Sequence, residues 1–127
     1  MIPFLIFERT IPMLIDGVEY VRKDMHEGVI RDGMQYCIVR TESAGVFAGY
    51  VASRNGNEAE LIDSRRIWYW SGAASLSELA VRGTSAPGEC KFPCVVPQET
   101  VFGVIEIIPC TGAACDSIKG VKEWTQH

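Results

Sequence analysis

Histidine is scarce in this sequence, and its scarcity limits the catalytic chemistry that the chain can support. The two histidines are His26 and His127, and the second is the last residue of the sequence. The imidazole base that usually activates a serine or cysteine nucleophile is therefore hardly available. The sequence also has no glycine-rich phosphate loop with its lysine, no zinc-protease helix and no nucleophile elbow. An enzyme is the minority interpretation, and we expect no catalytic residue and no cofactor.

Long apolar runs and an excess of positive charge are also absent. No apolar stretch approaches the roughly 20 residues that a membrane-spanning helix needs. The apolar start of the chain lacks the basic region of a signal peptide and soon reaches Glu8 and Arg9. The formal net charge of -4 argues against general binding of nucleic-acid polymers, because neutralising their phosphates needs a basic surface. We therefore expect a cytoplasmic protein that contacts neither a membrane nor a nucleic-acid polymer.

The five cysteines do not form a convincing metal site. An odd number of cysteines fits a reducing compartment, where thiols remain free. Cys90, Cys94, Cys110 and Cys115 superficially resemble four zinc ligands, but their spacings are looser than those of common zinc knuckles. Pro93 lies within the first pair, and no histidine is near. We expect buried structural thiols and no bound metal.

Turn signals divide the first half of the chain into short strands. Asp16 and Gly17, Asp32 and Gly33, and Asn55 and Gly56 are dipeptides typical of tight hairpin turns. The strands expected around them are residues 11–15, 18–22, 28–30, 35–41, 46–53 and 58–62. The length of 127 residues fits one core. The sequence predicts an α+β fold: a mainly antiparallel β-sheet or partial barrel with one or two short helices.

The second half of the chain contains both expected helices. Ser75 and Glu78 form a capping box, which predicts a helix that ends at Arg82 before Gly83. Residues 84–97 are rich in proline and small residues and are expected to form a loop. Residues 101–108 are the most hydrophobic strand candidate, and we expect them to be central in the sheet. Thr111 can cap a second helix over residues 112–119.

Residues 65–70 form the most unusual stretch, because two arginines are followed by an isoleucine and then by three adjacent aromatic residues. Aromatic and β-branched residues favour a strand here, and Ser71 and Gly72 then form a turn before the helix. Side chains alternate between the two faces of a strand. One face carries Arg66, Trp68 and Trp70, and the other carries Arg65, Ile67 and Tyr69. The sequence leaves open which face is buried.

Either face combines a guanidinium with a planar ring, which suits a nucleobase and its phosphate. The turn leads into a helix whose free amides favour an anion, and the corner at residues 43–45 could offer further amides. The candidate ligand-binding residues are Arg65, Arg66, Trp68, Tyr69, Trp70, Ser71, Gly72, Ser75, Ser43 and Gly45. The structural alternative is as strong, because tryptophan and tyrosine on strands commonly pack in cores or interfaces.

The carboxylates Glu58, Glu60 and Asp63 are more typical of a solvated face than of a catalytic pair.

Two long segments carry a resemblance to a known family. They are SAGVFAGY at residues 43–50 and RRIWYWSGAASLSELA at residues 65–80, and the similarity covers roughly residues 35–125. The chain resembles a family of small uncharacterised proteins encoded by tailed bacteriophages and prophages. We therefore divide it into an N-terminal β-hairpin extension, residues 1–33, and an α+β domain, residues 34–127.

The resemblance implies a phage origin and a setting in the host cytoplasm. Small phage accessory proteins often counter host immunity, and one class of them sequesters cyclic oligonucleotide or cyclic ADP-ribose signals. With the arginine and aromatic residues, this leads to the hypothesis of a homo-oligomer that binds a small, anionic, nucleotide-like ligand without catalysis. One alternative is a protein-interaction module that inhibits a host protein through its aromatic patch. The other is a hydrolase of the phosphodiesterase type, with Asp63 or Glu60 as base.

Overall fold

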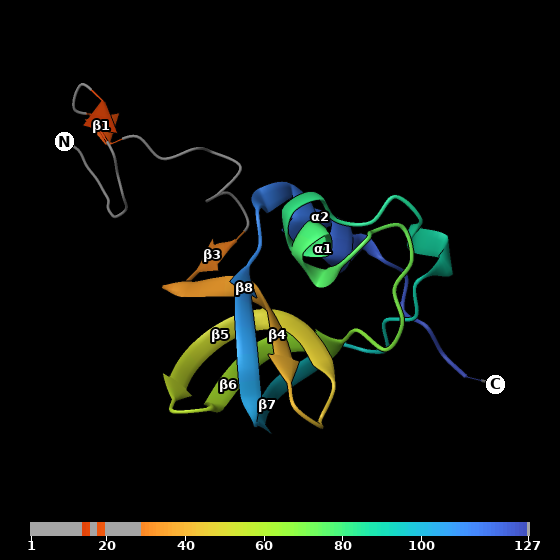
Figure 1. Ribbon diagram of the computed structural model, residues 1–127, viewed down its shortest axis with the longest axis horizontal. Helices are drawn as coiled ribbons and strands as arrows, with labels where there is room; N and C mark the ends of the chain where they lie inside the picture. The colour runs from red at the N-terminus through yellow and green to blue at the C-terminus, as the bar shows by residue number, and fades with distance from the viewer. Residues whose placement is uncertain (1–13, 16–17, 20–28, 127) are drawn as a thin grey trace.

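The structure is a computed structural model that describes residues 14–15, 18–19 and 29–126. Strands dominate, and the first of two short helices follows β6 (Figure 1). The elements are β1 (Leu14–Ile15), β2 (Val18–Glu19), β3 (Ile30–Arg31), β4 (Met34–Thr41), β5 (Val46–Asn55), β6 (Glu58–Arg66), α1 (Leu76–Arg82), the 3-10 turn η2 (Pro87–Glu89), β7 (Val96–Phe102), β8 (Val104–Pro109) and α2 (Gly112–Gly120). The predicted α+β class is confirmed.

The six strands β3 to β8 form one open antiparallel sheet that is strongly curved. Its order is β3-β4-β5-β6-β7, and β8 pairs with the edge of β4 that faces away from β5. A single residue, Gly103, separates β7 from β8. The chain therefore passes from one end of the sheet to the other within one residue, which requires the two ends of the sheet to approach each other.

The expectation of one central strand over residues 101–108 is wrong. Gly103 has a φ of 74°, a value that L side chains rarely adopt, and the chain bends there. The hydrophobic segment is thus divided between β7 and β8, which lie at opposite ends of the sheet order. Ile105 is accordingly 54% exposed despite its apolar surroundings in the sequence.

The turns follow the sequence signals where the structure describes them. Asp32 and Gly33 both have positive φ, 52° and 80°, as the tight turn between β3 and β4 requires. Gly56 occupies the next turn with a φ of 64°. β1 and β2 pair as the predicted N-terminal hairpin, but Asp16 and Gly17 lie outside the described residues, as does most of the 1–33 extension.

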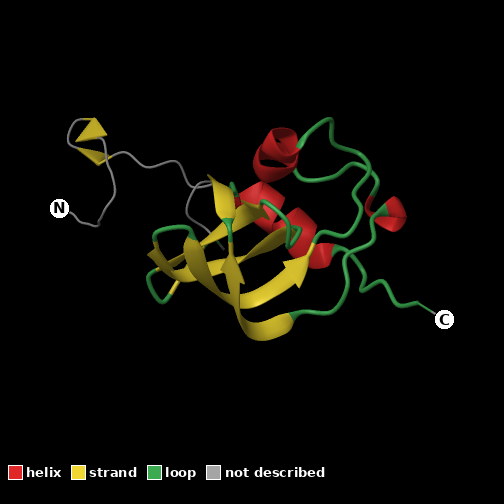
Figure 2. Cartoon of the chain, turned by 60° about the horizontal axis from the view of Figure 1, so that its bottom comes forward, coloured by secondary structure: helices red, strands yellow, loops and turns green. Residues whose placement is uncertain are grey.

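Both predicted helices are confirmed, and Figure 2 shows them together on one side of the sheet. The Ser75 hydroxyl accepts a hydrogen bond from the Glu78 amide at 3.2 Å, which starts α1. The Thr111 hydroxyl accepts one from the Ala114 amide at 3.1 Å, which starts α2. Thr111 also donates to the Val81 carbonyl at 2.8 Å, so the cap of α2 joins the two helices.

The alternation of side chains along the strands separates two hydrophobic cores. The inner core packs residues from all five long strands, and its fully enclosed members are Cys37, Val39, Phe47, Ala59, Leu61 and Val101. The helix-side core lies between the other face of the sheet and the helices, and its largest members are Tyr36, Ile38, Tyr50, Leu79, Phe92 and Ile118. Neighbouring residues of one strand therefore belong to different layers.

A β-bulge at Asp63 changes this alternation in β6. Tyr50 pairs with Ile62 and Ala48 pairs with Arg65, so two steps along β5 correspond to three along β6. Asp63 has a φ of 49°, and it is one of two described non-glycine residues with positive φ. One extra residue reverses the faces of all residues that follow it in the strand. The bulge therefore decides which way the two arginines point.

Gly49 provides the space opposite this bulge, and replacing it should destabilise the fold. A Cβ at residue 49 would lie 2.5 Å from the Ser64 Cβ and 2.7 Å from the Ser64 Cα, which is backbone and cannot easily move. We expect Gly49→Ala to lower the free energy of unfolding by about 1–3 kcal/mol in urea denaturation, as overpacking generally does. Gly88→Ala is the matched control, because a Cβ added there would have no atom within 4 Å. Equal stability of the two variants would contradict this packing.

Candidate ligand sites on both faces of β6

Arg65 and Arg66 lie on opposite faces of the sheet. Arg65 pairs with Ala48 and turns toward the helices, where it is 4% exposed. Arg66 pairs with Phe47, and its guanidinium carbon lies 4.5 Å from the centre of the Phe47 ring. Phe47 belongs to the inner core, so Arg66 covers an end of that core. The sequence left open which face of this stretch is buried. The structure places the buried Arg65 side chain on the helix side of the sheet and the partly exposed Arg66 side chain on the other.

The strand expected over residues 65–70 ends earlier than predicted. β6 stops at Arg66, and beyond it the only described ladder contact is an isolated bridge between Tyr69 and Lys91. The Ile67 amide still donates to the Val46 carbonyl at 2.8 Å. Regular pairing is lost because β7, the neighbour of β6, begins only at Val96, opposite Ser64.

A hollow of about 340 Å³, here named the Arg66 pocket, gathers half of the predicted ligand-binding residues. The members that were predicted are Ser43, Gly45, Arg66, Trp68 and Trp70, and the others are Ala44, Val46 and Ile67. Arg65, Tyr69, Ser71, Gly72 and Ser75 do not line it. The structure thus brings the 43–45 corner and the aromatic stretch together, although they lie more than 20 residues apart in the chain.

Arg66 is the charged group of this pocket. One terminal nitrogen donates to the Ala44 carbonyl. Among the described residues, its other guanidinium donors have no hydrogen-bond partner, and no carboxylate forms an ion pair with it. A guanidinium has five donors, so several remain for a ligand oxygen.

The three aromatic residues of this stretch differ in exposure and packing. Trp68 is 64% exposed, so most of its indole is open to stacking. Trp70 packs against the helix-side core and donates its indole N–H to the Ala73 carbonyl at 3.1 Å. Tyr69 is 52% exposed and lies outside the pocket, with the Lys91 ammonium 5.8 Å from its ring centre.

One amide of the 43–45 corner, that of Ala44, is not available to a ligand, although the sequence suggested it. The Ala44 amide donates to the Thr41 hydroxyl at 2.9 Å, and that hydroxyl donates to the Gly45 carbonyl at 2.7 Å. The Ala44 amide is therefore already satisfied within the turn. Ser43 is exposed and is one of the residues that line the pocket.

The residues that follow the aromatic stretch hold the chain itself together. The Ser71 hydroxyl donates to Glu89 at 3.3 Å, and the Gly72 carbonyl accepts from the Ser85 amide at 3.1 Å. Ser75 caps α1, and the Glu78 carboxylate accepts from the Ala74 amide at 2.7 Å. This amide holds the pKa of Glu78 below its usual value. The start of α1 thus carries its own carboxylate, which leaves it unsuited to a second anion.

Arg65 has a different role from the one that the sequence suggested, because its guanidinium bonds only to backbone carbonyls. Nη1 donates to Ile118 at 3.1 Å and Val121 at 2.8 Å, and Nη2 donates to Phe92 at 2.8 Å. Nη2 and Nε also donate to the Pro93 carbonyl. All three nitrogens are engaged, and burial lowers the pKa of Arg65. The side chain connects β6 to the end of α2 and to the 92–93 segment.

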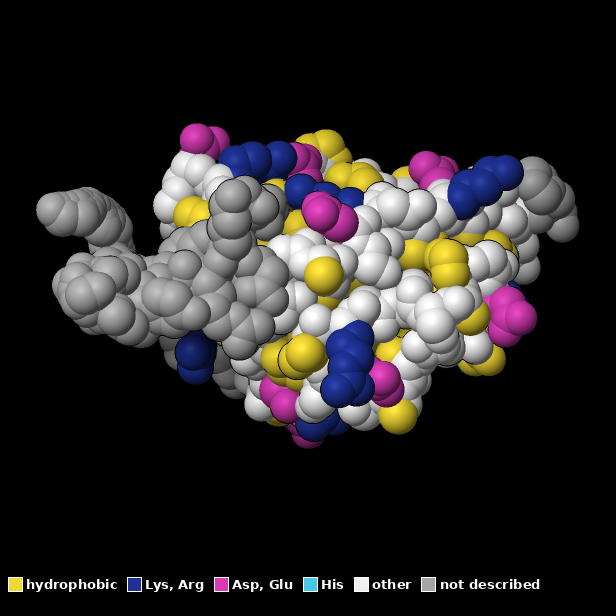
Figure 3. Space-filling model, turned by 90° about the horizontal axis from the view of Figure 1, so that it is seen from above, with side chains coloured by type: hydrophobic (Ala, Val, Ile, Leu, Met, Phe, Trp, Pro, Cys, Tyr) yellow, Lys and Arg dark blue, Asp and Glu magenta, His cyan; other side chains and the backbone are white. Residues whose placement is uncertain are grey.

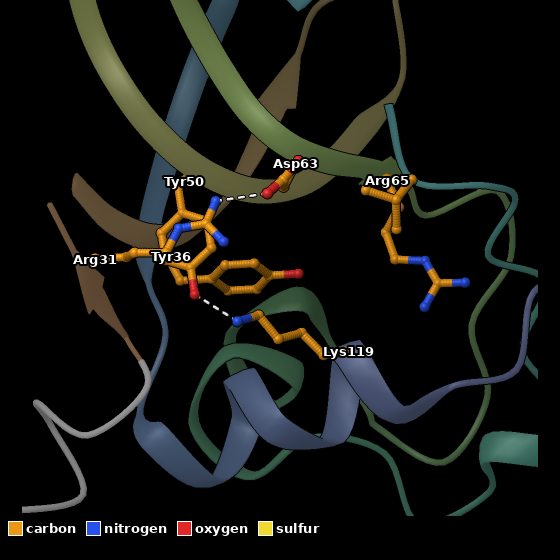
Figure 4. A pocket seen from close by; sticks show the side chains of 7 residues that line it. Arg31, Tyr36, Tyr50, Asp63, Arg65 and Lys119 are labelled. Atoms are coloured by element: carbon orange, nitrogen blue, oxygen red, sulfur yellow. Dashed lines mark hydrogen bonds and ion pairs between the residues drawn. The ribbon is translucent and has the colours of Figure 1, made fainter. Parts of the chain in front are cut away.

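A second hollow of about 340 Å³, here named the Tyr36 pocket, lies between the sheet and α2 (Figure 4). Its main lining residues are Arg31, Tyr36, Tyr50, Asp63, Arg65 and Lys119. Sequence reasoning missed it because Tyr36 and Tyr50 look like ordinary core residues in strands, while Lys119 lies on a distant helix. The bulge that directs Asp63 toward Arg31, at 2.6 Å, has no sequence signal that we recognise.

The two candidate bases are paired, and four of the five cysteines are buried. Cys94 is exposed, so the expectation of buried thiols is wrong at that residue. Asp63 is paired with Arg31, and Glu60 accepts from the Gln98 amide, so neither candidate base is free. Burial raises the pKa of the Cys37 thiol to about 12 and keeps it protonated. Within the described residues, no three potential ligands cluster closely enough to hold a metal ion.

The surface charges do not gather into a basic stripe on the face that Figure 3 shows. Lysine and arginine side chains there lie beside aspartate and glutamate side chains. A long polyanion would therefore meet alternating signs on this face. None of the helices described here has the length and apolar character needed to cross a membrane.

Taken together, the fold and the two pockets define a small α+β domain with a curved sheet and an arginine-aromatic surface. A comparison with known families matches residues 34–118 to a domain of unknown function, DUF6948. The chain belongs to this family, since the match covers well over half of it. No curated protein and no solved structure matches the chain.

The structural role of Arg65 predicts a large difference between two neighbouring substitutions. Arg65→Lys keeps the charge but cannot reach four carbonyls at once, so we expect the free energy of unfolding to fall by about 3 kcal/mol or more. Arg66→Lys should cost less than about 1 kcal/mol, because that side chain is partly exposed and makes one hydrogen bond. Urea denaturation of both variants measures the difference. Similar losses would show that the carbonyl contacts of Arg65 are unimportant.

Proposed function

We propose that the protein binds a small, anionic, nucleotide-like ligand in the Arg66 pocket and sequesters it without changing it. The observation that carries this proposal is the position of Arg66 beside Trp68. Arg66 has unused donors and no acidic partner among the described residues, and Trp68 next to it is largely exposed. An uncompensated cation and an open indole at one hollow are the two groups that recognise a phosphate and a base.

The physical chemistry of the two groups fits this ligand class. A guanidinium edge binds phosphate oxygens with two parallel hydrogen bonds. A nucleobase that stacks on an exposed aromatic side chain gains roughly 1–3 kcal/mol. The hollow, at about 340 Å³, is at the small end of the range for ligand pockets, which favours one nucleotide unit in contact with each chain.

The biological setting of the proposal comes from the resemblance of residues 43–50 and 65–80 to phage and prophage proteins. A phage protein in the host cytoplasm could remove a cyclic oligonucleotide or cyclic ADP-ribose signal that activates host defence. Sequestration of this kind needs no histidine base and no metal. It does need a stoichiometric amount of protein, and a cyclic ligand with several phosphates favours a homo-oligomer that offers more than one pocket.

Thermal shift with a panel of cyclic dinucleotides, cyclic trinucleotides and cyclic ADP-ribose isomers tests this proposal. A ligand at a hundred times its Kd should stabilise the protein by about 2.7 kcal/mol and raise its Tm. Trp68→Ala should weaken binding roughly tenfold or more, through the loss of stacking. Light scattering of the same samples gives the number of subunits.

Tyr69→Ala is the matched control for Trp68→Ala. Both side chains are exposed aromatics in adjacent positions, but only Trp68 lines the pocket. The control should bind as the unmodified protein does, and recovery of intact ligand after incubation excludes hydrolysis. Absence of a shift across the whole panel, or equal losses in both variants, would contradict the proposal.

A second candidate function is inhibition of a host protein through the exposed aromatic residues. The observation in its favour is that Trp68 and Tyr69 are adjacent and are 64% and 52% exposed, which is unusual for large aromatics. A protein partner would cover both rings, so both alanine variants should lose it. The same pair of variants therefore separates this function from ligand binding, which depends on Trp68 alone.

A further inference from the structure

The Tyr36 pocket contains a buried hydroxyl, that of Tyr36, for which the described part of the chain offers no hydrogen-bond partner. Tyr36 is only 1% exposed, and its hydroxyl forms no hydrogen bond with any described residue. Figure 4 shows this hydroxyl pointing into the middle of the pocket, on the side that faces Arg65. Burial raises the pKa of Tyr36, so the group remains a protonated donor. A buried hydroxyl that bonds to nothing is costly, so one aimed into a hollow indicates a ligand acceptor.

The charges around this hydroxyl favour a negative ligand. Arg31, Arg65 and Lys119 line the pocket, and Asp63 is the one carboxylate among the lining residues. Arg31 is paired with Asp63 at 2.6 Å, which leaves the charges of Arg65 and Lys119 without an acidic partner in the pocket. This excess of positive charge occurs on a chain whose formal net charge is -4.

Lys119 can supply the donors that Arg65 cannot. The guanidinium of Arg65 is fully used by backbone carbonyls. The Lys119 ammonium donates to the Tyr50 hydroxyl, which uses one of its three protons. It lies 4.7 Å from the centre of the Tyr50 ring and 5.3 Å from that of Tyr36, so both rings help to hold it.

The remaining surface of the pocket is apolar. The Tyr36 and Tyr50 rings meet edge to face, with their centres 5.0 Å apart, and Val95 lies nearby among the lining residues. The hydrogen-bond donors of Tyr36 and Lys119 therefore occupy one part of the pocket wall, and the tyrosine rings and Val95 form an apolar part. A bare inorganic ion would leave that ring surface uncovered, whereas a compact planar body would cover it.

From this arrangement we propose that the Tyr36 pocket is a second binding site, separate from the Arg66 pocket, for a small organic oxyanion with a flat apolar body. The Tyr36 hydroxyl and the Lys119 ammonium bind the anionic oxygens. The tyrosine rings contact the body of the ligand. Carboxylate and phosphate share this chemistry, and the probes below distinguish them.

Titration with benzoate and with phenyl phosphate, followed by NMR or thermal shift, tests this site. Benzamide has the same ring without the charge and is the matched neutral probe. We expect benzoate, phenyl phosphate or both to bind, and benzamide to bind at least about tenfold more weakly. Tyr36→Phe and Lys119→Met should each weaken binding of the anion at least about tenfold. Trp68→Ala should leave it unchanged, which separates this site from the Arg66 pocket.

The stability of the unliganded variants gives an independent readout. Because the Tyr36 hydroxyl has no partner among the described residues, Tyr36→Phe should keep or raise the Tm. Tyr50→Phe is the matched control and should lower the Tm, since the Tyr50 hydroxyl accepts from Lys119. A lowered Tm in Tyr36→Phe, equal binding of benzamide and benzoate, or unchanged anion binding in Tyr36→Phe would each overturn the proposal. Failure of both anionic probes to bind would do so as well.

Discussion

The structure depends on the buried guanidinium of Arg65 and the four carbonyls that surround it. Two of these carbonyls belong to Ile118 in α2 and Val121 just after it, and two belong to residues 92–93. The end of a helix carries a partial negative charge, so the cation is stabilised there without a carboxylate. One side chain therefore joins the sheet, the last helix and the long loop, and the walls of the Tyr36 pocket keep their positions because of it.

The bulge at Asp63 is what allows this arrangement. In a regular strand, Arg65 would share the inner face with Leu61, and Arg66 would face the helices. The extra residue reverses both, and it does so with Asp63 in a left-handed conformation that costs free energy. Because of this strained bulge, the two adjacent arginines lie on opposite faces of the sheet, Arg65 on the helix side and Arg66 on the side of the inner core. Arg65 stabilises the fold, and Arg66 remains available at the other face.

Local signals predicted the parts of the fold that local chemistry determines. The capping residues of both helices and the Asp32–Gly33 turn could be read directly, because each rests on hydrogen bonds or φ values within a few residues. The positions of β7 and β8 in the sheet could not be predicted. The pairing of residues 101–108 depends on which edge strands of the sheet are unpaired, and local sequence does not determine this. Part of the candidate site could be predicted, because Arg66 and Trp68 do line one pocket. The sequence could not show that all guanidinium nitrogens of Arg65 are hydrogen-bonded, because the carbonyls that accept from them lie up to 56 residues away.

The central claim, that the two neighbouring arginines have opposite roles, is tested most directly by NMR of their side-chain Nε–H groups. Arg65 is buried and hydrogen-bonded, so its Nε–H should exchange slowly with water and its signal should not move when a nucleotide-like ligand is added. The Arg66 Nε–H should exchange quickly and should shift on ligand binding. Slow exchange at Arg66 with fast exchange at Arg65, or a ligand-induced shift confined to Arg65, would contradict this account.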